Sequence, residues 1–213
     1  MKVEIWSDVM CPFCYIGKRK FEAALEQFSR KDEVEVVWHS FQLNPDMVDQ
    51  PGKSAIEYLA EVKNQSIEWS QEMHNHVTES AKKVGLEYHF EKVKVANSFD
   101  AHRLVQLAKK YNLTDALEER FFRAYFTEGA LISNHAELVQ LAVEVGLDEK
   151  EVEGVLSSDQ FYADVIRDGQ DAANLGVRGV PFFAMDRKFG VSRAQDVEVF
   201  LERLEKAFEY PGF

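Results

Sequence analysis

The feature that most restricts the fold of this chain is a pair of cysteines, Cys11 and Cys14, placed where one sequence period gives way to another. Residues 2–6 alternate as in a β-strand, whereas apolar residues recur at helical spacing over 16–28, after Pro12. The pattern predicts a strand that runs directly into a helix. Both cysteines then stand at the start of that helix.

The rest of the chain continues this alternation of elements. Residues 33–41, rich in β-branched and aromatic side chains, predict a second strand that ends before the turn formers Asn44-Pro45-Asp46. From Ser54 to about Gly176 the period is helical, with predicted caps and helix ends at Ser54 with Glu57, Asp148 with Glu151, Gly85, Gly146 and Gly176.

After Gly176 the strand pattern returns in "VPFFAM" and "KFGV", and a final helix follows. Ser192 and Gln195 predict a capping box that opens this helix. Asp186-Arg187 is a poor pair for a type I′ turn, so the strands of this hairpin are better defined than its turn.

The predicted fold class is therefore α/β, β-α-β followed by helices and then β-β-α. We expect one domain over 1–213, with a core formed by 1–47 and 177–213 and a helical insertion at 48–176. No Pro, Gly or Ser-rich linker separates the helices from their flanks, which favours an insertion over an independent domain.

Composition narrows the possible partners and the compartment. The formal net charge is −12, with 25 Lys and Arg against 37 Asp and Glu, which argues against a nucleic-acid or anionic membrane surface. The N-terminus lacks the apolar run of a secretory signal, and no window is apolar enough to span a membrane. We therefore expect a cytoplasmic protein, in which a CxxC motif is more often catalytic or metal-binding than a structural disulfide.

A thiol at a helix start faces unpaired N–H groups and the positive end of the helix dipole, which favour thiolate over thiol. Cys11 is predicted to be an exposed nucleophile and Cys14, one turn further in, the resolving thiol. Pro12 suits the first helical turn because its missing N–H costs no hydrogen bond there. Lys18-Arg19-Lys20 favour the thiolate and Asp8 opposes it, so the balance stays open.

Two cysteines at this spacing are also compatible with a zinc site or with inert core packing. A zinc site needs four ligands, and the nearest clustered histidines, His74 and His76, lie some sixty residues away in a helical segment, so we expect no metal site. Two inert core cysteines are also possible, but a strand-to-helix junction with a proline between the thiols argues against them.

The neighbours of the thiols suggest how reactivity is adjusted. Phe13 occupies the second of the two positions between the cysteines and donates no hydrogen bond to a Cys11 thiolate, so we expect a less oxidising disulfide than histidine would give. Far along the chain, Val180-Pro181 directly precedes a strand, a position that suits a cis proline in a tight turn or a trans proline at a strand start.

With these motifs the chain resembles the thioredoxin fold in its DsbA-like form over essentially its whole length. The segments "FQLNP", "ANSFDAHRL", "FFRAYFTEG" and "GVPFF…VSRAQ" resemble the cytosolic branch of FrnE-type dithiol oxidoreductases and 2-hydroxychromene-2-carboxylate isomerases, relatives of kappa-class glutathione transferases. The resemblance implies an enzyme, a thiol–disulfide oxidoreductase that needs no bound cofactor and acts on thiol or disulfide substrates, either proteins or glutathione as co-substrate.

The same resemblance implies a substrate-binding set. Pro181 would be a cis-proline beside the cysteines, and Val180 would pair an extended peptide or glutathione through its backbone, with Pro12 and Phe13 beside them. Ser192 would receive an anion at a helix N-terminus, although Arg193 stands where a small residue is expected. Asn97 would face the thiol cleft or be buried structure.

Two other functions stay open. One is a glutathione-dependent isomerase or transferase, in which Cys11 merely occupies the position of a serine. The other is a chaperone-like protein that holds unfolded chains without using either thiol.

Overall fold

In the computed structural model, which describes residues 1–210, the chain divides into two compact units. Unit 1 comprises residues 1–43 and 166–213, and unit 2 comprises residues 44–165. The expected insertion at 48–176 begins four residues and ends eleven residues later than unit 2. Residues 211–213, the end of the expected core segment, lie outside the described residues.

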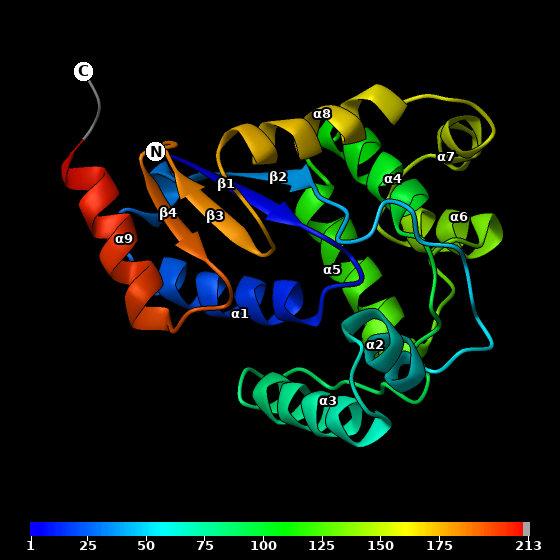
Figure 1. Cartoon of the computed structure of the whole chain (residues 1–213). Coiled ribbons are helices and arrows are strands. Elements are labelled where there is room, and N and C mark those ends of the chain that lie inside the picture. Colours follow the sequence, from blue (N-terminus) through cyan, green and yellow to red (C-terminus); the bar gives the residue numbers. More distant parts are fainter. Residues whose placement is uncertain (211–213) are drawn as a thin grey trace. The chain divides into compact units, whose positions relative to one another are not determined.

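Unit 1 is built on a four-stranded sheet whose strands run in the order β2-β1-β3-β4 (Figure 1). Strand β1 pairs parallel with β2 and antiparallel with β3, and β3 pairs antiparallel with β4. The strands are β1 (Lys2–Ser7), β2 (Glu35–Ser40), β3 (Phe182–Met185) and β4 (Phe189–Ser192). The predicted order β-α-β, helices, β-β-α is confirmed.

The two faces of the sheet are covered differently within unit 1. Helices α1 (Pro12–Gln27) and α9 (Val197–Glu209) pack on one face, where Val3 and Ile5 of β1 join the main core. Trp6 of the same strand points to the opposite face and packs with Ala172 of α8 (Tyr162–Asn174). This alternation of side chains is why a six-residue strand serves two hydrophobic cores.

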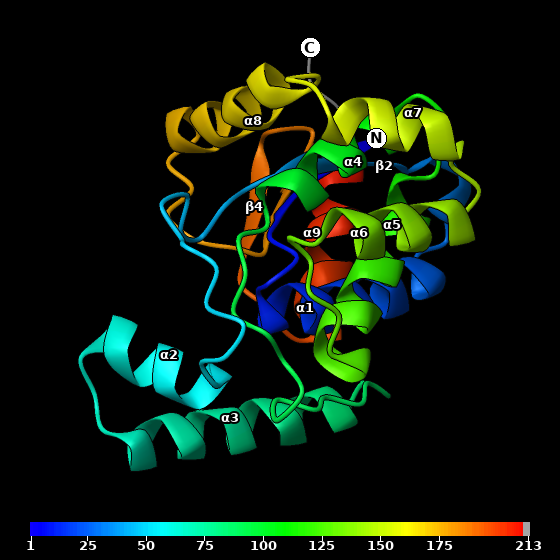
Figure 2. The same cartoon turned by 90° about the vertical axis from the view of Figure 1, so that its right-hand side faces the viewer.

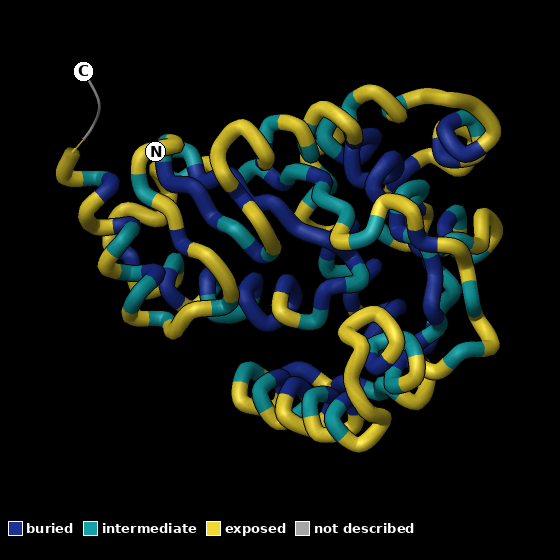
Figure 3. The backbone as a smooth tube through the Cα atoms, viewed as in Figure 1, coloured by how far each residue is buried: buried dark blue, intermediate teal, exposed yellow. Residues whose placement is uncertain are grey.

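Unit 2 is helical. Its α2 (Ala55–Lys63) begins with the predicted capping box of Ser54 and Glu57, and α2 lies beside α3 (Ile67–Lys82) (Figure 2). The other elements are α4 (Phe99–Lys109), α5 (Thr114–Arg123), a π-helical turn (Ala124–Glu128), α6 (His135–Glu144) and α7 (Glu149–Leu156). Figure 3 shows buried and exposed residues alternating along these helices, as amphipathic sequences predict.

The turn between β3 and β4 has type I′ geometry although its residue pair is unfavourable for that turn. Asp186 and Arg187 both have positive φ, 48° and 55°, as a type I′ turn requires, and Lys188 N–H donates to the Met185 carbonyl at 3.0 Å. Contacts of the Asp186 and Arg187 side chains stabilise the turn. Asp186 accepts a hydrogen bond from the Lys2 N–H at 2.7 Å, and Arg187 binds the Glu4 carboxylate at 2.7 Å.

The predicted start of the last helix is wrong. Helix α9 begins at Val197 with Asp196 as N-cap, so Ser192 is the last residue of β4 and not a cap. Between them Arg193 adopts φ 68°, and its N–H donates to the Pro181 carbonyl at 2.8 Å, which turns the chain before the helix starts. A left-handed φ explains why a glycine would be expected at position 193.

Candidate active site

The two cysteines stand at the N-terminus of α1, as the sequence predicts. Cys11 is the N-cap residue and Pro12 the first helical residue. A tight turn leads into the helix, because Cys11 N–H donates to the Asp8 carbonyl and Cys14 N–H to the Cys11 carbonyl, both at 3.0 Å. The end of β1 thereby fixes the backbone that carries both thiols.

Cys11 is held against the loop that precedes β3. Its Sγ lies 3.6 Å from the Val180 carbonyl oxygen, and the Val180–Pro181 peptide bond is cis. The contact joins residues 169 positions apart in sequence, both in unit 1. Cys11 is only 4% exposed, so the expectation of an exposed thiol is wrong: the Val180 backbone lies against it.

Cys14 is buried more completely, at 1% exposure, and both thiols are free in this structure. Burial raises the pKa of the Cys14 thiol well above its ordinary value, and the interaction with Cys11 adds to this rise. The backbone N–H of Asp8 and the Ser7 side chain act in the opposite direction and lower the Cys14 pKa. The environment therefore keeps Cys14 protonated while placing two donors next to it.

Helix α1 approaches the Pro181 loop closely, and Gly17 allows this approach. A Cβ at Gly17 would come within 2.9 Å of Pro181 Cγ and 3.4 Å of the Phe183 ring. Gly17 lies three residues beyond Cys14 and is therefore on the same side of the helix. Sequence reasoning missed it, although a glycine inside an amphipathic helix is a signal of close packing.

The charges near the thiols are already paired within unit 1. The basic residues of α1 that the sequence placed near the thiols form ion pairs, Lys18 and Arg19 with Glu22 and Lys20 with Asp196 at 2.8 Å. The buried Asp8 carboxylate accepts hydrogen bonds from two backbone N–H groups, those of Leu43 at 2.8 Å and Met10 at 3.3 Å. The basic residues of α1 and the Asp8 carboxylate therefore each have a partner other than the thiols.

The other predicted binding residues fall in different places. Phe13 is 41% exposed beside the thiols, and Pro181 is buried against α1. Ser192 is exposed on β4. Asn97 lies in unit 2, where its amide donates to the Met47 carbonyl at 2.8 Å and its side-chain oxygen accepts from Phe99 N–H at 2.8 Å. These bonds shape the entry to α4.

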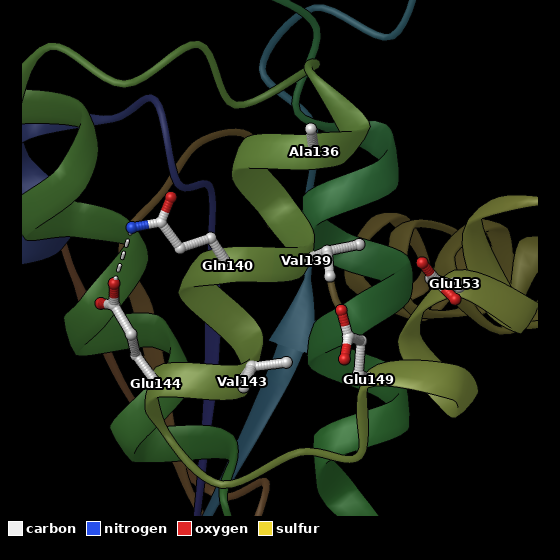
Figure 4. A pocket seen from close by; sticks show the side chains of 7 residues that line it. All are labelled: Ala136, Val139, Gln140, Val143, Glu144, Glu149 and Glu153. Atoms are coloured by element: carbon white, nitrogen blue, oxygen red, sulfur yellow. Dashed lines mark hydrogen bonds between the residues drawn. The ribbon is translucent and has the colours of Figure 1, made fainter.

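Unit 2 also has a surface depression between α6 and α7, shown in Figure 4, where Gln140 donates to Glu144 at 3.2 Å. None of the predicted site residues lines it. Its lining consists of Ala136, Val139, Gln140, Val143, Glu144, Glu149 and Glu153. Across residues 1–210, no group of three or more His, Cys, Asp or Glu side chains is arranged to hold a metal ion.

This sheet, with a CxxC at the start of α1 and a cis proline before β3, defines a thioredoxin-fold protein. A family model described as the DSBA-like thioredoxin domain matches residues 2–205, and the chain belongs to that family.

Relatives support this assignment. The chain is 32% identical over 172 residues to "Uncharacterized protein YwbO" of Bacillus subtilis (strain 168), an alignment that covers 78% of this chain and 76% of that protein. The solved structure of a probable DsbA oxidoreductase, SCO1869 from Streptomyces coelicolor, is 39% identical, with a TM-score of 0.94 over 100% of this chain and 92% of that one.

A more distant structure shares the fold alone. The cytosolic disulfide reductase DsbM of Pseudomonas aeruginosa is 19% identical, with a TM-score of 0.69 over 98% of this chain and 99% of that one.

Proposed function

We propose that this protein is a thiol–disulfide oxidoreductase in which Cys11 is the nucleophile and Cys14 the resolving thiol. The observation that carries the proposal is the contrast between the two thiols at one helix start. Cys11 caps α1 beside the Val180 carbonyl, whereas Cys14 is sealed one turn further in. Membership of the DSBA-like family supports the same chemistry.

In the proposed reaction, the Cys11 thiolate attacks one sulfur of a substrate disulfide and expels the other as a thiolate. This step forms a mixed disulfide. The Cys14 thiolate then attacks Cys11 Sγ, releases the second substrate thiolate and leaves a Cys11–Cys14 disulfide. The substrate gains two electrons and the protein loses two; the reverse sequence oxidises a dithiol. The direction depends on the protein's potential relative to the surrounding thiol pool.

The loop around Pro181 is the proposed substrate platform. The Val180 backbone, next to Cys11 Sγ, would pair an extended peptide or glutathione, and the exposed Phe13 and the ring of Pro12 would border it. Ser192 and Asn97 have weaker support as binding residues. Ser192 does not begin a helix, and the Asn97 amide is occupied by backbone partners of unit 2.

Glutathione is the proposed small co-substrate, and the cytoplasm the proposed compartment. The structure of DsbM with GSH supports the first idea, and the description of DsbM as cytosolic supports the second, although both describe that protein. Each helix within residues 1–210 is either too short or too polar to be a membrane span.

A matched pair of variants tests the assignment of the two thiols. Cys14→Ser, treated with oxidised glutathione, should accumulate a glutathione adduct on Cys11 that mass spectrometry detects. Cys11→Ser should form an adduct on Cys14 at least tenfold more slowly, because that thiol is buried and held protonated.

Equal adduct formation by the two variants would contradict these roles, and no adduct in either would contradict the function. If Cys11→Ser instead retained turnover with glutathione and an aromatic substrate, the isomerase alternative would hold. A variant with both cysteines changed to alanine that still suppressed client aggregation would favour the chaperone alternative.

A further inference from the structure

Ser7 carries a buried hydroxyl that the surrounding protein does not satisfy. It is the last residue of β1 and is 0% exposed. Within the part of the chain that the structure describes, its Oγ has no hydrogen-bond partner of ordinary geometry. Buried hydroxyls are nearly always paired, so a group left without a partner calls for a functional explanation.

The neighbour that explains Ser7 is Cys14. The turn from Asp8 through Cys11 folds the first turn of α1 back against the end of β1. The Ser7 side chain and the Asp8 N–H are the two groups that favour the ionised form of Cys14. Side chains alternate along a strand, so Ser7 lies on the same side of β1 as Ile5, the side that packs on α1. Its hydroxyl therefore faces the helix that carries Cys14.

The Ser7 hydroxyl has no hydrogen-bond partner among the residues that the structure describes, yet the Ser7 side chain lowers the pKa of Cys14. The two observations agree because the first concerns the neutral thiol and the second the thiolate. A neutral thiol is a weak acceptor and does not draw the hydroxyl into close contact. A thiolate is a charged acceptor, and hydrogen bonds to charged acceptors are shorter and about twice as strong. The hydroxyl gains its partner when Cys14 ionises.

We propose that the Ser7 hydroxyl, together with the Asp8 N–H, forms a two-donor site for the Cys14 thiolate and so speeds the step in which Cys14 attacks the mixed disulfide. This inference rests on the proposed function, since it concerns the resolving thiol. Ser7 keeps its own proton and donates only a hydrogen bond. The Cys14 proton leaves for the thiolate that the first attack has expelled when that thiolate is basic, and for water when it is a weakly basic aromatic thiolate.

Other titratable groups stand near Cys14 in the described part of unit 1. Cys11 caps the same helix and Tyr15 follows Cys14 in it, Asp8 follows Ser7 at the end of β1, and Lys18 lies one turn further along α1. The Asp8 carboxylate is held by backbone N–H groups and Lys18 by Glu22. The Ser7 hydroxyl, which has no hydrogen-bond partner among residues 1–210, remains able to donate to an ionised Cys14.

The test is a stopped-flow reaction of the reduced protein with an aromatic disulfide that releases a coloured thiolate. The first equivalent reports attack by Cys11 and the second reports resolution by Cys14. Ser7→Ala should slow the second phase by about tenfold near neutral pH and move its pH profile upward, with the first phase unchanged. Ser7→Thr, which retains the hydroxyl, should stay close to the wild type.

Ser70→Ala is the matched control. Ser70 is also fully buried, but its hydroxyl donates to the Ile56 carbonyl at 2.7 Å within unit 2. Its loss should lower stability without changing either phase. Equal second phases in wild type and Ser7→Ala, or equal slowing in the Ala and Thr variants, would overturn the proposal.

A second measurement separates this inference from the proposed function. In a Cys11→Ala background, the ultraviolet absorbance of the thiolate reports the titration of Cys14 alone. Adding Ser7→Ala should raise the midpoint of that titration. An unchanged midpoint would reject the role of Ser7, whereas a wild-type protein that releases only one coloured equivalent would reject the proposed function and leave this titration as the test of Ser7.

Discussion

At the scale of single residues, the site depends on two cysteines with the same side chain and different surroundings. Cys11 contacts a carbonyl oxygen from a distant loop, whereas Cys14 is enclosed beneath it and its pKa is raised by burial. The sequence predicted both positions from the spacing and Pro12. It could not predict the burial of Cys11, because the covering loop is 169 residues away.

The identity of residue 13 should set the potential of the pair. Phe13 is 41% exposed on the first turn of α1, so its replacement is not expected to disturb the core. Phe13→His should make the disulfide more oxidising, because an imidazole can donate a hydrogen bond to the Cys11 thiolate. We expect a shift of about tenfold in the equilibrium constant with glutathione, about 30 mV.

Phe13→Tyr serves as the control, since it keeps an aromatic ring without placing a donor nitrogen near the sulfur. The equilibrium constant is measured by separating oxidised and reduced protein after equilibration. A histidine variant with the same constant as the tyrosine variant would show that residue 13 does not tune the pair.

At the scale of elements, the site depends on how α1 meets the Pro181 loop. Gly17 permits that contact, since any larger side chain would press on Pro181 Cγ. Gly17→Ala should destabilise the protein by about 1–3 kcal/mol through overpacking, despite the higher helix propensity of alanine. Urea denaturation of the reduced protein measures the change.

Gly169→Ala is the matched control. Gly169 lies inside α8 and a Cβ there would meet nothing within 4 Å. It should be neutral or stabilising by up to about 1 kcal/mol. If both alanine variants were equally stable, the close packing of α1 on Pro181 would be refuted.

The start of α9 shows what sequence patterns miss at this scale. Ser192 and Gln195 have the spacing of a capping box, but Arg193 turns the chain by bonding to the Pro181 carbonyl. Lys20 of α1 then bonds the Ala194 carbonyl and the Asp196 carboxylate, which fixes where the helix begins. These tertiary contacts override the local signal. By contrast, the caps at Ser54 and Asp148 are purely local, and both are confirmed.

At the scale of the whole molecule, a charged network around the buried Glu4 helps hold unit 1 together. Glu4 of β1 binds Arg187 of the hairpin turn at 2.7 Å and His39 of β2 at 3.0 Å, and His39 also contacts Asp168 of α8 at 2.9 Å. Arg187 in turn pairs with Asp171 of α8 at 2.6 Å. The network thus connects β1, β2, the turn between β3 and β4, and α8.

This network predicts a specific acid sensitivity. Hydrogen bonds from Arg187, and then the charges of Lys2, Arg187 and His39, lower the pKa of Glu4 from 4.5 to about 2 against the effect of burial. A lowered folded-state pKa stabilises the protein above the unfolded value. That stabilisation disappears as the pH falls through about 2.

The loss should be on the order of 2 to 3 kcal/mol, allowing for the screening of the half-exposed Arg187. Urea denaturation at a series of pH values should show this loss in the wild type and not in Glu4→Gln. Glu202→Gln, which removes an exposed partner of Lys206, should keep the wild-type pH dependence. The same acid slope in Glu4→Gln would contradict the assigned role of Glu4.

The order of elements, the family and the positions of the cysteines follow from sequence because they depend on periodicity and short motifs. Ser7 and Gly17 were missed because their roles appear only when β1, α1 and the Pro181 loop are brought together. A signal existed in each case. Ser7 is a polar residue that follows the apolar Ile5 and Trp6 at the end of a buried strand, and Gly17 interrupts an apolar helix face.

The most direct test of the central claim is a redox titration of the intact chain. The protein is equilibrated with mixtures of reduced and oxidised glutathione, and its free thiols are trapped and counted by mass spectrometry. We predict that both thiols disappear together as the mixture becomes more oxidising, and that they return on reduction, as a reversible Cys11–Cys14 disulfide requires. Two thiols that stay free across the whole cytosolic range of glutathione potentials would contradict the account.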